Sequence, residues 1–178
     1  EEALDTHGLA YSYLGNWMPA LQRMIDLRNT LGLRSPIHSL ARVINPLNAH
    51  CGLQSIFHPG YQAVHREASR LLGDHAIVIK GEGGEIEVNP DVACHLYGTR
   101  NGEDWDEEWP ALSAQRHVKP ERLDPAVLVA FWRGEHDDAY GRLAVIATMA
   151  TALRGLGLSR DEAMQQARQR WDARFQSN

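Results

Sequence analysis

The stretch that decides the fold is 52–80, which reads GLQSIFHPGYQAVHREASRLLGDHAIVIK. It begins with a short apolar-rich segment at 53–57, and a His-Pro-Gly turn then leads into a helix over about 60–72 that Gly73 ends. The continuous Ala-Ile-Val-Ile run within 75–80 is typical of a strand that is covered on both faces. A strand, a helix and a strand at this spacing predict a βαβ unit with a parallel strand pair.

The pattern changes on both sides of this unit. Upstream, 17–31 is predicted to be a helix with Pro19 in its first turn, and 33–52 is predicted to be a long structured loop. Downstream, the alternating segment 85–88 predicts a half-exposed strand, and 92–97 predicts a further strand. The acidic segment 98–123 is predicted to be irregular.

The last third of the chain reads as helical. Asp124 followed by Pro125 is an N-cap signal, 138–155 carries one apolar stripe, and 159–162 has the sequence of a capping box. We therefore expect an α/β fold with an open, mixed but mainly parallel sheet flanked by helices, and a helical C-terminal third. No linker is visible, so 1–178 is predicted to form a single domain.

Composition limits the classes of function. Of the 178 residues, 43% are hydrophobic and 23% charged, and the formal net charge is −5, which does not fit a wholly basic nucleic-acid-binding protein. The longest purely apolar run is 126–132, so we expect no membrane span. Two cysteines cannot make a disulfide framework or a metal site by themselves. A reducing, cytoplasmic setting is the default expectation.

The charges are unevenly distributed along the chain. The segment 23–80 is mainly basic, and 81–108 is strongly acidic with Arg100 as its one basic residue. The plain interpretation is that both are solvated faces. The functional alternative is an anion site in the basic segment, since Arg, Lys and backbone N–H groups hold phosphates and carboxylates.

The loop 81–84, Gly-Glu-Gly-Gly, is neither a dinucleotide fingerprint nor a P-loop, and a simple tight turn is its plainest interpretation. Lys80 precedes it, and Glu82, Glu85 and Glu87 lie in and after it. Ligands bind at strand ends in open α/β sheets, and carboxylates gathered there could hold Mg²⁺.

Two further polar residues remain open to either interpretation. His38, in the long loop, is more simply structural than a ligand, because the histidines show no metal-ligand spacing. Arg28 is either a surface residue or an anchor for a carboxylate, to which its planar guanidinium is suited.

Several of these segments together resemble one family. The stretch 27–35, LRNTLGLRS, followed by a loop that ends in Ile44-Asn45-Pro46, resembles the pattern R-x-x-L-G-x-R-T … N-P of anthranilate phosphoribosyltransferases. The stretch 76–87, AIVIKGEGGEIE, resembles that family's strand ending in H-G-x-D-G-x-D-E, and 124–175 is similar to its C-terminal helices. The pattern is collinear over nearly the whole chain.

The resemblance implies a glycosyltransferase of family 3 with the C-terminal fold type of nucleoside phosphorylases and phosphoribosyltransferases. Such an enzyme transfers a phosphoribosyl group from phosphoribosyl pyrophosphate, with Mg²⁺, to an aromatic amine that carries a carboxylate, and it is usually a homodimer. Arg28 matches the family position that holds the anthranilate carboxylate. We expect Arg28, Arg34, His38 and Lys80 to bind substrate, and Glu87, with Glu85 as a substitute for the missing carboxylate, to bind the metal. The resemblance implies that this chain is the C-terminal part, without the helical N-terminal domain and the glycine-rich pyrophosphate loop, and hence inactive alone.

The chain also departs from the family pattern. Ile86-Glu87 stands where the family carries Asp-Glu, so we expect Mg²⁺ binding to be weak or lost. Met18 stands where the family has a histidine on the substrate side. With these departures the chain resembles a divergent branch of paralogues within the family, some members of which bind nucleic acid. The alternative function is therefore a non-catalytic nucleic-acid-binding protein.

Overall fold

The structure is a computed structural model that describes residues 2–81, 85–118 and 124–175. It divides into two compact units, Glu1–Ile44 and Asn45–Asn178. The organisation of 1–178 as a single domain stays a prediction.

The first unit is helical. It contains α1 (Glu2–His7), α2 (Leu14–Trp17), α3 (Pro19–Leu31) and α4 (Ile37–Leu40). Helix α3 has Pro19 at its start and ends at Gly32, whose φ of 68° is the left-handed conformation that glycine adopts without a Cβ clash. The helix predicted over 17–31 is thus confirmed, with its start two residues later. Leu21 is the buried residue of α3.

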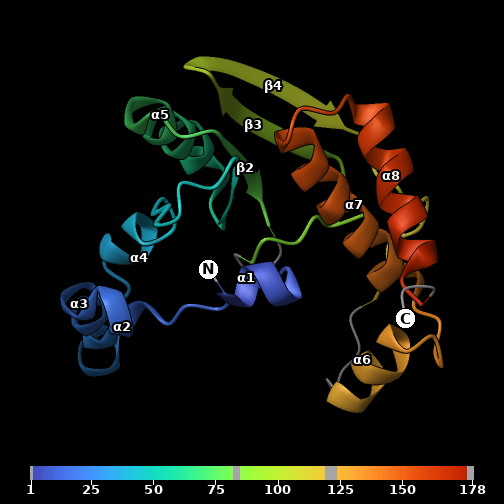
Figure 1. The fold of residues 1–178 in the computed structure, drawn as a ribbon, viewed down its shortest axis with the longest axis horizontal. Coiled ribbons are helices and arrows are strands. Elements are labelled where there is room, and N and C mark those ends of the chain that lie inside the picture. Colours follow the sequence, from blue (N-terminus) through green and yellow to red (C-terminus); the bar gives the residue numbers. More distant parts are fainter. Residues whose placement is uncertain (1, 82–84, 119–123, 176–178) are drawn as a thin grey trace. The chain divides into compact units, whose positions relative to one another are not determined.

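The second unit is built on a four-stranded sheet with the order β1-β2-β3-β4 (Figure 1). Strand β1 (Gly52–Ile56) pairs in parallel with β2 (Ala76–Lys80), with Leu53 opposite Ile77. The connection between them is a 3₁₀ turn, η1 (Pro59–Tyr61), followed by α5 (Gln62–Leu72). The predicted βαβ unit is confirmed, and so is the helix stop at Gly73, which has a φ of 75°.

Antiparallel pairing completes the sheet. Strand β3 (Cys94–Arg100) is antiparallel to β2, and β4 (Glu103–Trp109) is antiparallel to β3. The two-residue turn Asn101-Gly102 joins them, and both residues have positive φ angles, 54° and 79°. Such a turn matches the twist of a hairpin, so most of 98–109 is strand and not the predicted irregular segment. The sheet is mixed as expected, but parallel pairing is confined to β1 and β2.

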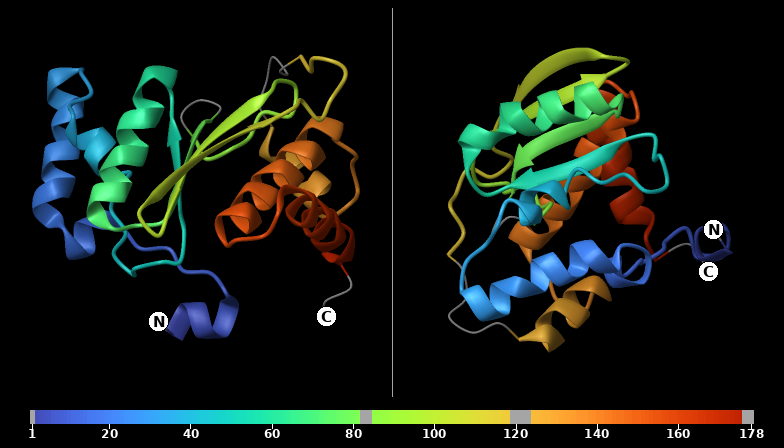
Figure 2. Two further views of the ribbon diagram at one scale, coloured as in Figure 1. Left: turned by 90° about the horizontal axis from the view of Figure 1, so that it is seen from above. Right: turned by 90° about the vertical axis from the view of Figure 1, so that its left-hand side faces the viewer.

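Helices cover both faces of the sheet (Figure 2). Helix α5 packs on β2 and β3, whereas α7 (Ala139–Gly155) packs on β1 and β2 from the other side and α8 (Arg160–Ala173) packs on α7. The remaining helix of this unit is α6 (Pro125–Trp132). Small buried residues, Ala147 and Ala150 on α7 and Ala163 and Ala167 on α8, let these two helices approach closely within the core. The α/β class and the helical C-terminal third are confirmed.

The segment 85–88 differs from its prediction. It is not a strand but an irregular connection after β2, in which the Glu87 N–H donates to the carbonyl of Glu85 at 2.9 Å. The Val88 N–H donates to Thr148 Oγ1 of α7 at 3.0 Å. The Thr148 hydroxyl therefore accepts the hydrogen bond that the Val88 N–H would donate to a neighbouring strand if this segment were part of a sheet.

Candidate functional site

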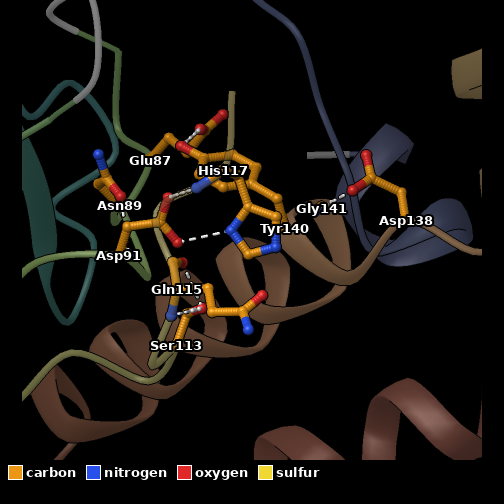
Figure 3. Close-up of polar contacts among 9 residues, drawn as sticks. All are labelled: Glu87, Asn89, Asp91, Ser113, Gln115, His117, Asp138, Tyr140 and Gly141. Atoms are coloured by element: carbon orange, nitrogen blue, oxygen red, sulfur yellow. Dashed lines mark hydrogen bonds and ion pairs between the residues drawn. The ribbon is translucent and has the colours of Figure 1, made fainter. Parts of the chain in front are cut away.

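Glu87 is the best anchored of the predicted site residues in the second unit. It is partly buried, and its Oε1 accepts a hydrogen bond from the Tyr140 hydroxyl on α7 at 3.0 Å (Figure 3). Glu85 and Lys80, at the end of β2, are exposed. Glu82 lies outside the described residues. The sequence thus predicted Glu87 as a site residue but gave no hint of its partner.

Tyr140 lies in the first turn of α7, and the cap of that helix fixes where the turn begins. Asp138 is the N-cap residue, and its Oδ1 accepts from the Gly141 N–H at 3.0 Å. An Asp at this position satisfies one of the free N–H groups of the first turn and defines the start of the helix. The Tyr140 side chain thereby reaches Glu87 across 53 positions of sequence.

Asp91 and His117 form a second polar pair beside the first (Figure 3). Asp91 Oδ1 lies 2.7 Å from His117 Nδ1, and Asp91 Oδ2 accepts from the His117 backbone N–H at 2.7 Å. The Asp91 side chain is only 5% exposed and that of His117 is 32% exposed. The two pairs meet where the His117 and Tyr140 rings pack edge to face, with centroids 5.6 Å apart. We call Glu87, Asp91, His117 and Tyr140 the polar cluster.

Backbone hydrogen bonds hold the segment that carries His117. The N–H groups of Leu112 and Ser113 both donate to the carbonyl of Pro90, at 2.8 and 3.0 Å. The Asp91 N–H in turn donates to Asn89 Oδ1 at 2.9 Å. The segment after β4 is therefore fastened to the segment before β3, and His117 is held at a defined place.

The surroundings of Asp91 favour its ionised form. Burial raises the pKa of the carboxyl, but the hydrogen bonds from the His117 backbone and ring, together with the charge of Arg116 and that of His117 when its ring is protonated, outweigh this effect and lower the pKa. Asp91 is therefore a carboxylate at neutral pH and accepts from His117 with both oxygens.

A groove of about 450 Å³ adjoins the polar cluster. Glu87, Tyr140 and Asp138 supply carboxylate and hydroxyl groups to a lining that is otherwise mainly apolar, with contributions from α6 and α7. Its volume lies in the range of small-molecule sites, which combine apolar walls with a few polar groups that orient the ligand.

The predicted Mg²⁺ residues Glu85 and Glu87 lie in the irregular connection after β2. Glu85 and Glu87 are separated by Ile86, and one Glu87 oxygen is already hydrogen-bonded to Tyr140. Within 2–81, 85–118 and 124–175 there is no group of three or more His, Cys, Asp or Glu residues that could hold a metal ion. Weak Mg²⁺ binding stays a prediction.

The remaining predicted substrate residues lie in the first unit. Arg28, in the last turn of α3, and Arg34, just after it, are exposed. His38, on α4, accepts from the Ser35 backbone N–H through Nδ1 at 3.2 Å. Its buried Nε2 has no hydrogen-bond partner in the part of the chain that the structure describes. The six predicted residues are thus divided between two units, and Glu87 is the one of them that forms part of the polar cluster.

Comparison with known proteins supports the family resemblance. No protein-family model matches the chain. The chain is similar to the anthranilate phosphoribosyltransferase of Paracidovorax citrulli, with 29% identity over 141 residues, which are 74% of this chain and 41% of the relative. It is also similar to those of Ralstonia pickettii (32%, covering 57% of the chain and 30% of the relative) and Novosphingobium aromaticivorans (31%, covering 58% and 32%). The chain therefore spans less than half the length of these relatives.

Proposed function

We propose that the protein carrying this chain is a phosphoribosyltransferase of the anthranilate phosphoribosyltransferase type. The observation that carries the proposal is the similarity to curated enzymes of that name, at 29–32% identity. The reaction moves a phosphoribosyl group from phosphoribosyl pyrophosphate to an aromatic amine that bears a carboxylate. The groove beside the polar cluster, with its mainly apolar walls, is compatible with an aromatic ring.

The chemistry of this transfer is mainly electrostatic. As pyrophosphate departs, positive charge develops on the ribosyl carbon and negative charge on the leaving group, and groups placed to match these charges lower the barrier. We assign the exposed Lys80 ammonium and the Arg34 guanidinium to the phosphate-bearing donor, together with His38. We assign Arg28 to the carboxylate of the acceptor, since the planar guanidinium pairs with a carboxylate through two hydrogen bonds.

The experiment is a transferase assay on the full protein that contains this chain, with phosphoribosyl pyrophosphate and anthranilate as substrates. The loss of anthranilate fluorescence measures the reaction. We expect turnover, and we expect Arg28→Ala to weaken anthranilate binding about tenfold or more, because a charge-assisted bidentate pair contributes roughly 1.5–3 kcal/mol. Arg23→Ala, an exposed arginine of the same helix, is the matched control. The absence of turnover with any aromatic amine would reject the proposal.

A second candidate is a nucleic-acid-binding protein without transferase activity. The observation that favours it is the metal region, where Ile86 interrupts the carboxylates and Glu87 is bonded to Tyr140. Binding would then rest on phosphate contacts from the basic segment and weaken steeply with salt. A labelled oligonucleotide titrated at two salt concentrations tests it. Arg34→Ala and Arg42→Ala should each lower the salt slope by about one unit on every sequence.

The assembly and the location of the protein are proposed on separate grounds. We propose a homodimer, as the family resemblance implies, and sedimentation of the full protein tests it. We also propose a reducing, cytoplasmic setting, because the chain has two cysteines and no disulfide framework. No helix among the described residues is long and apolar enough to cross a membrane.

A further inference from the structure

Asp91 and His117 make two contacts, although one would be enough to hold their two segments together. The backbone N–H of His117, bonded to Asp91 Oδ2, would by itself fasten the two segments. The second oxygen lies 2.7 Å from the ring Nδ1. Because a carboxylate is only an acceptor, Nδ1 carries the proton, and in the neutral ring the lone pair is then on Nε2. The pair therefore fixes both the orientation and the tautomer of the imidazole.

The imidazole of His117 contacts a residue that lines the groove. The His117 side chain is about one-third exposed and packs against the ring of Tyr140 (Figure 3). Tyr140 lines the groove together with Glu87. The groups around the Asp91–His117 pair are less suited than the imidazole to take up a proton. Both oxygens of Asp91 already accept from His117, Tyr140 donates its hydroxyl proton to Glu87, and Arg116 is a cation.

We propose that His117 accepts the proton that the acceptor amine loses during transfer, with Asp91 as its positioning residue; this rests on the proposed function. The amine nitrogen forms a bond to the anomeric carbon with its lone pair, and the bond from that carbon to the pyrophosphate oxygen breaks, with its electron pair leaving on pyrophosphate. The nitrogen, now positively charged, releases one proton to Nε2 of His117. The products are a neutral secondary amine, pyrophosphate and an imidazolium stabilised by the Asp91 carboxylate.

The test uses the full protein with phosphoribosyl pyrophosphate and anthranilate. Removal of a positioned general base ordinarily costs 10²–10⁴ in rate, so we expect His117→Gln to lower kcat at least 100-fold with KM within about threefold. We also expect the wild-type kcat to fall at acidic pH, and this fall should be absent in His117→Gln. Added imidazole should partly restore the rate of His117→Ala, which a purely structural role would not produce. Asp91→Asn should lower kcat in the same direction, because the ring then loses its fixed tautomer.

His95→Gln is the matched control. His95 is another imidazole near a carboxylate, with Nε2 3.7 Å from Asp106, but it lies on β3 outside the polar cluster, and its replacement should leave kcat within about twofold. If wild type turns over and His117→Gln matches it, the role of His117 is refuted while the proposed function stands. If wild type does not turn over, the proposed function fails and the role of His117 fails with it. If His117→Gln unfolds at a lower temperature than wild type, the test rests on the pH–rate profile of the wild type. A wild-type kcat that does not fall at acidic pH overturns the inference.

Discussion

Replacing Glu107 by Gln tests how the sheet holds α7 in place. The Glu107 carboxylate, on β4, accepts from Arg154 Nε of α7 at 2.8 Å and from Trp109 Nε1 at 3.0 Å. The Arg154 guanidinium also lies over the Trp105 ring, 4.5 Å from its centroid. Strand β4 leads into the segment that carries His117, and α7 carries Tyr140. The pair therefore joins the two supports of the polar cluster.

The size of the effect follows from the burial of the pair. The side chains of Arg154 and Glu107 are 22% and 28% exposed, so water screens them only in part. Hydrogen bonds to charged groups contribute about 1.5–3 kcal/mol, and Gln keeps the shape but loses the charge. We expect Glu107→Gln to lower the free energy of unfolding by about 1–2 kcal/mol. In a chain of this size that lowers Tm by about 2–8 °C.

The effect of Glu107→Gln should also depend on pH. Burial raises the pKa of the Glu107 carboxyl, but the hydrogen bonds from Arg154 and Trp109, with the charges of Arg154 and Arg160, outweigh it and lower the pKa. A carboxyl with a lowered pKa in the folded state stabilises the fold above its unfolded-state pKa, and the contribution disappears as the pH falls through the folded-state value. The difference between wild type and variant should thus be full at pH 7 and shrink below about pH 4.5.

The measurement is thermal unfolding, monitored by circular dichroism at pH 7 and at a pH below about 4.5. Glu108→Gln is the control, since Glu108 is the next residue on β4, is exposed and loses the same charge. Its Tm should stay close to that of wild type, because exposed substitutions ordinarily change stability by about 0.5 kcal/mol or less. Equal melting of the two variants at pH 7, or a difference between them that persists in acid, would refute the reasoning.

Three further outcomes are expected. Gly81→Ala should lower Tm, because a Cβ would overlap the carbonyl oxygen of Glu85, and overpacking costs about 1–3 kcal/mol; Gly60→Ala, with open space around it, is the control. Ile86→Asp should tighten Mg²⁺ binding in the full protein with phosphoribosyl pyrophosphate present, and an unchanged Kd in calorimetry would show that the metal region is misplaced. Residues 1–178 alone should release no pyrophosphate from phosphoribosyl pyrophosphate and anthranilate, and measurable turnover by this chain would contradict the expectation.

The parts of the fold that could be predicted are those specified by neighbouring residues. The apolar run 76–79 with the helix before it was sufficient for the βαβ unit, because burial on both faces leaves no polar alternation. The helix starts at Asp124 and Ser159 were predicted from their side chains, and each accepts the expected backbone N–H.

The errors came from segments in which two local signals compete. In 98–109 the density of acidic residues favoured a loop, whereas Asn101-Gly102 is a strong hairpin signal that the charge obscured. In 85–88 the alternation favoured a strand, but no strand lies beside it within the described residues, and Thr148 takes the Val88 N–H instead. Alternation indicates which side chains are buried, whereas strand formation also requires a partner for the backbone.

The polar cluster lies beyond such reasoning because each of its bonds is made at long range. Asp91 and His117 are 26 positions apart, and Glu87 and Tyr140 are 53 apart. The Asp91 carboxylate fixes the orientation of a histidine that has no metal-ligand spacing, yet that carboxylate comes from the other side of the β3–β4 hairpin. The β3–β4 hairpin brings His117 next to Asp91, and the many acidic residues in its sequence had favoured a loop. The missed strand and the missed residue pair therefore have one cause. A sequence prediction that recognises the Asn101-Gly102 turn would bring 110–117 back beside 88–91 and make this pair of residues a candidate.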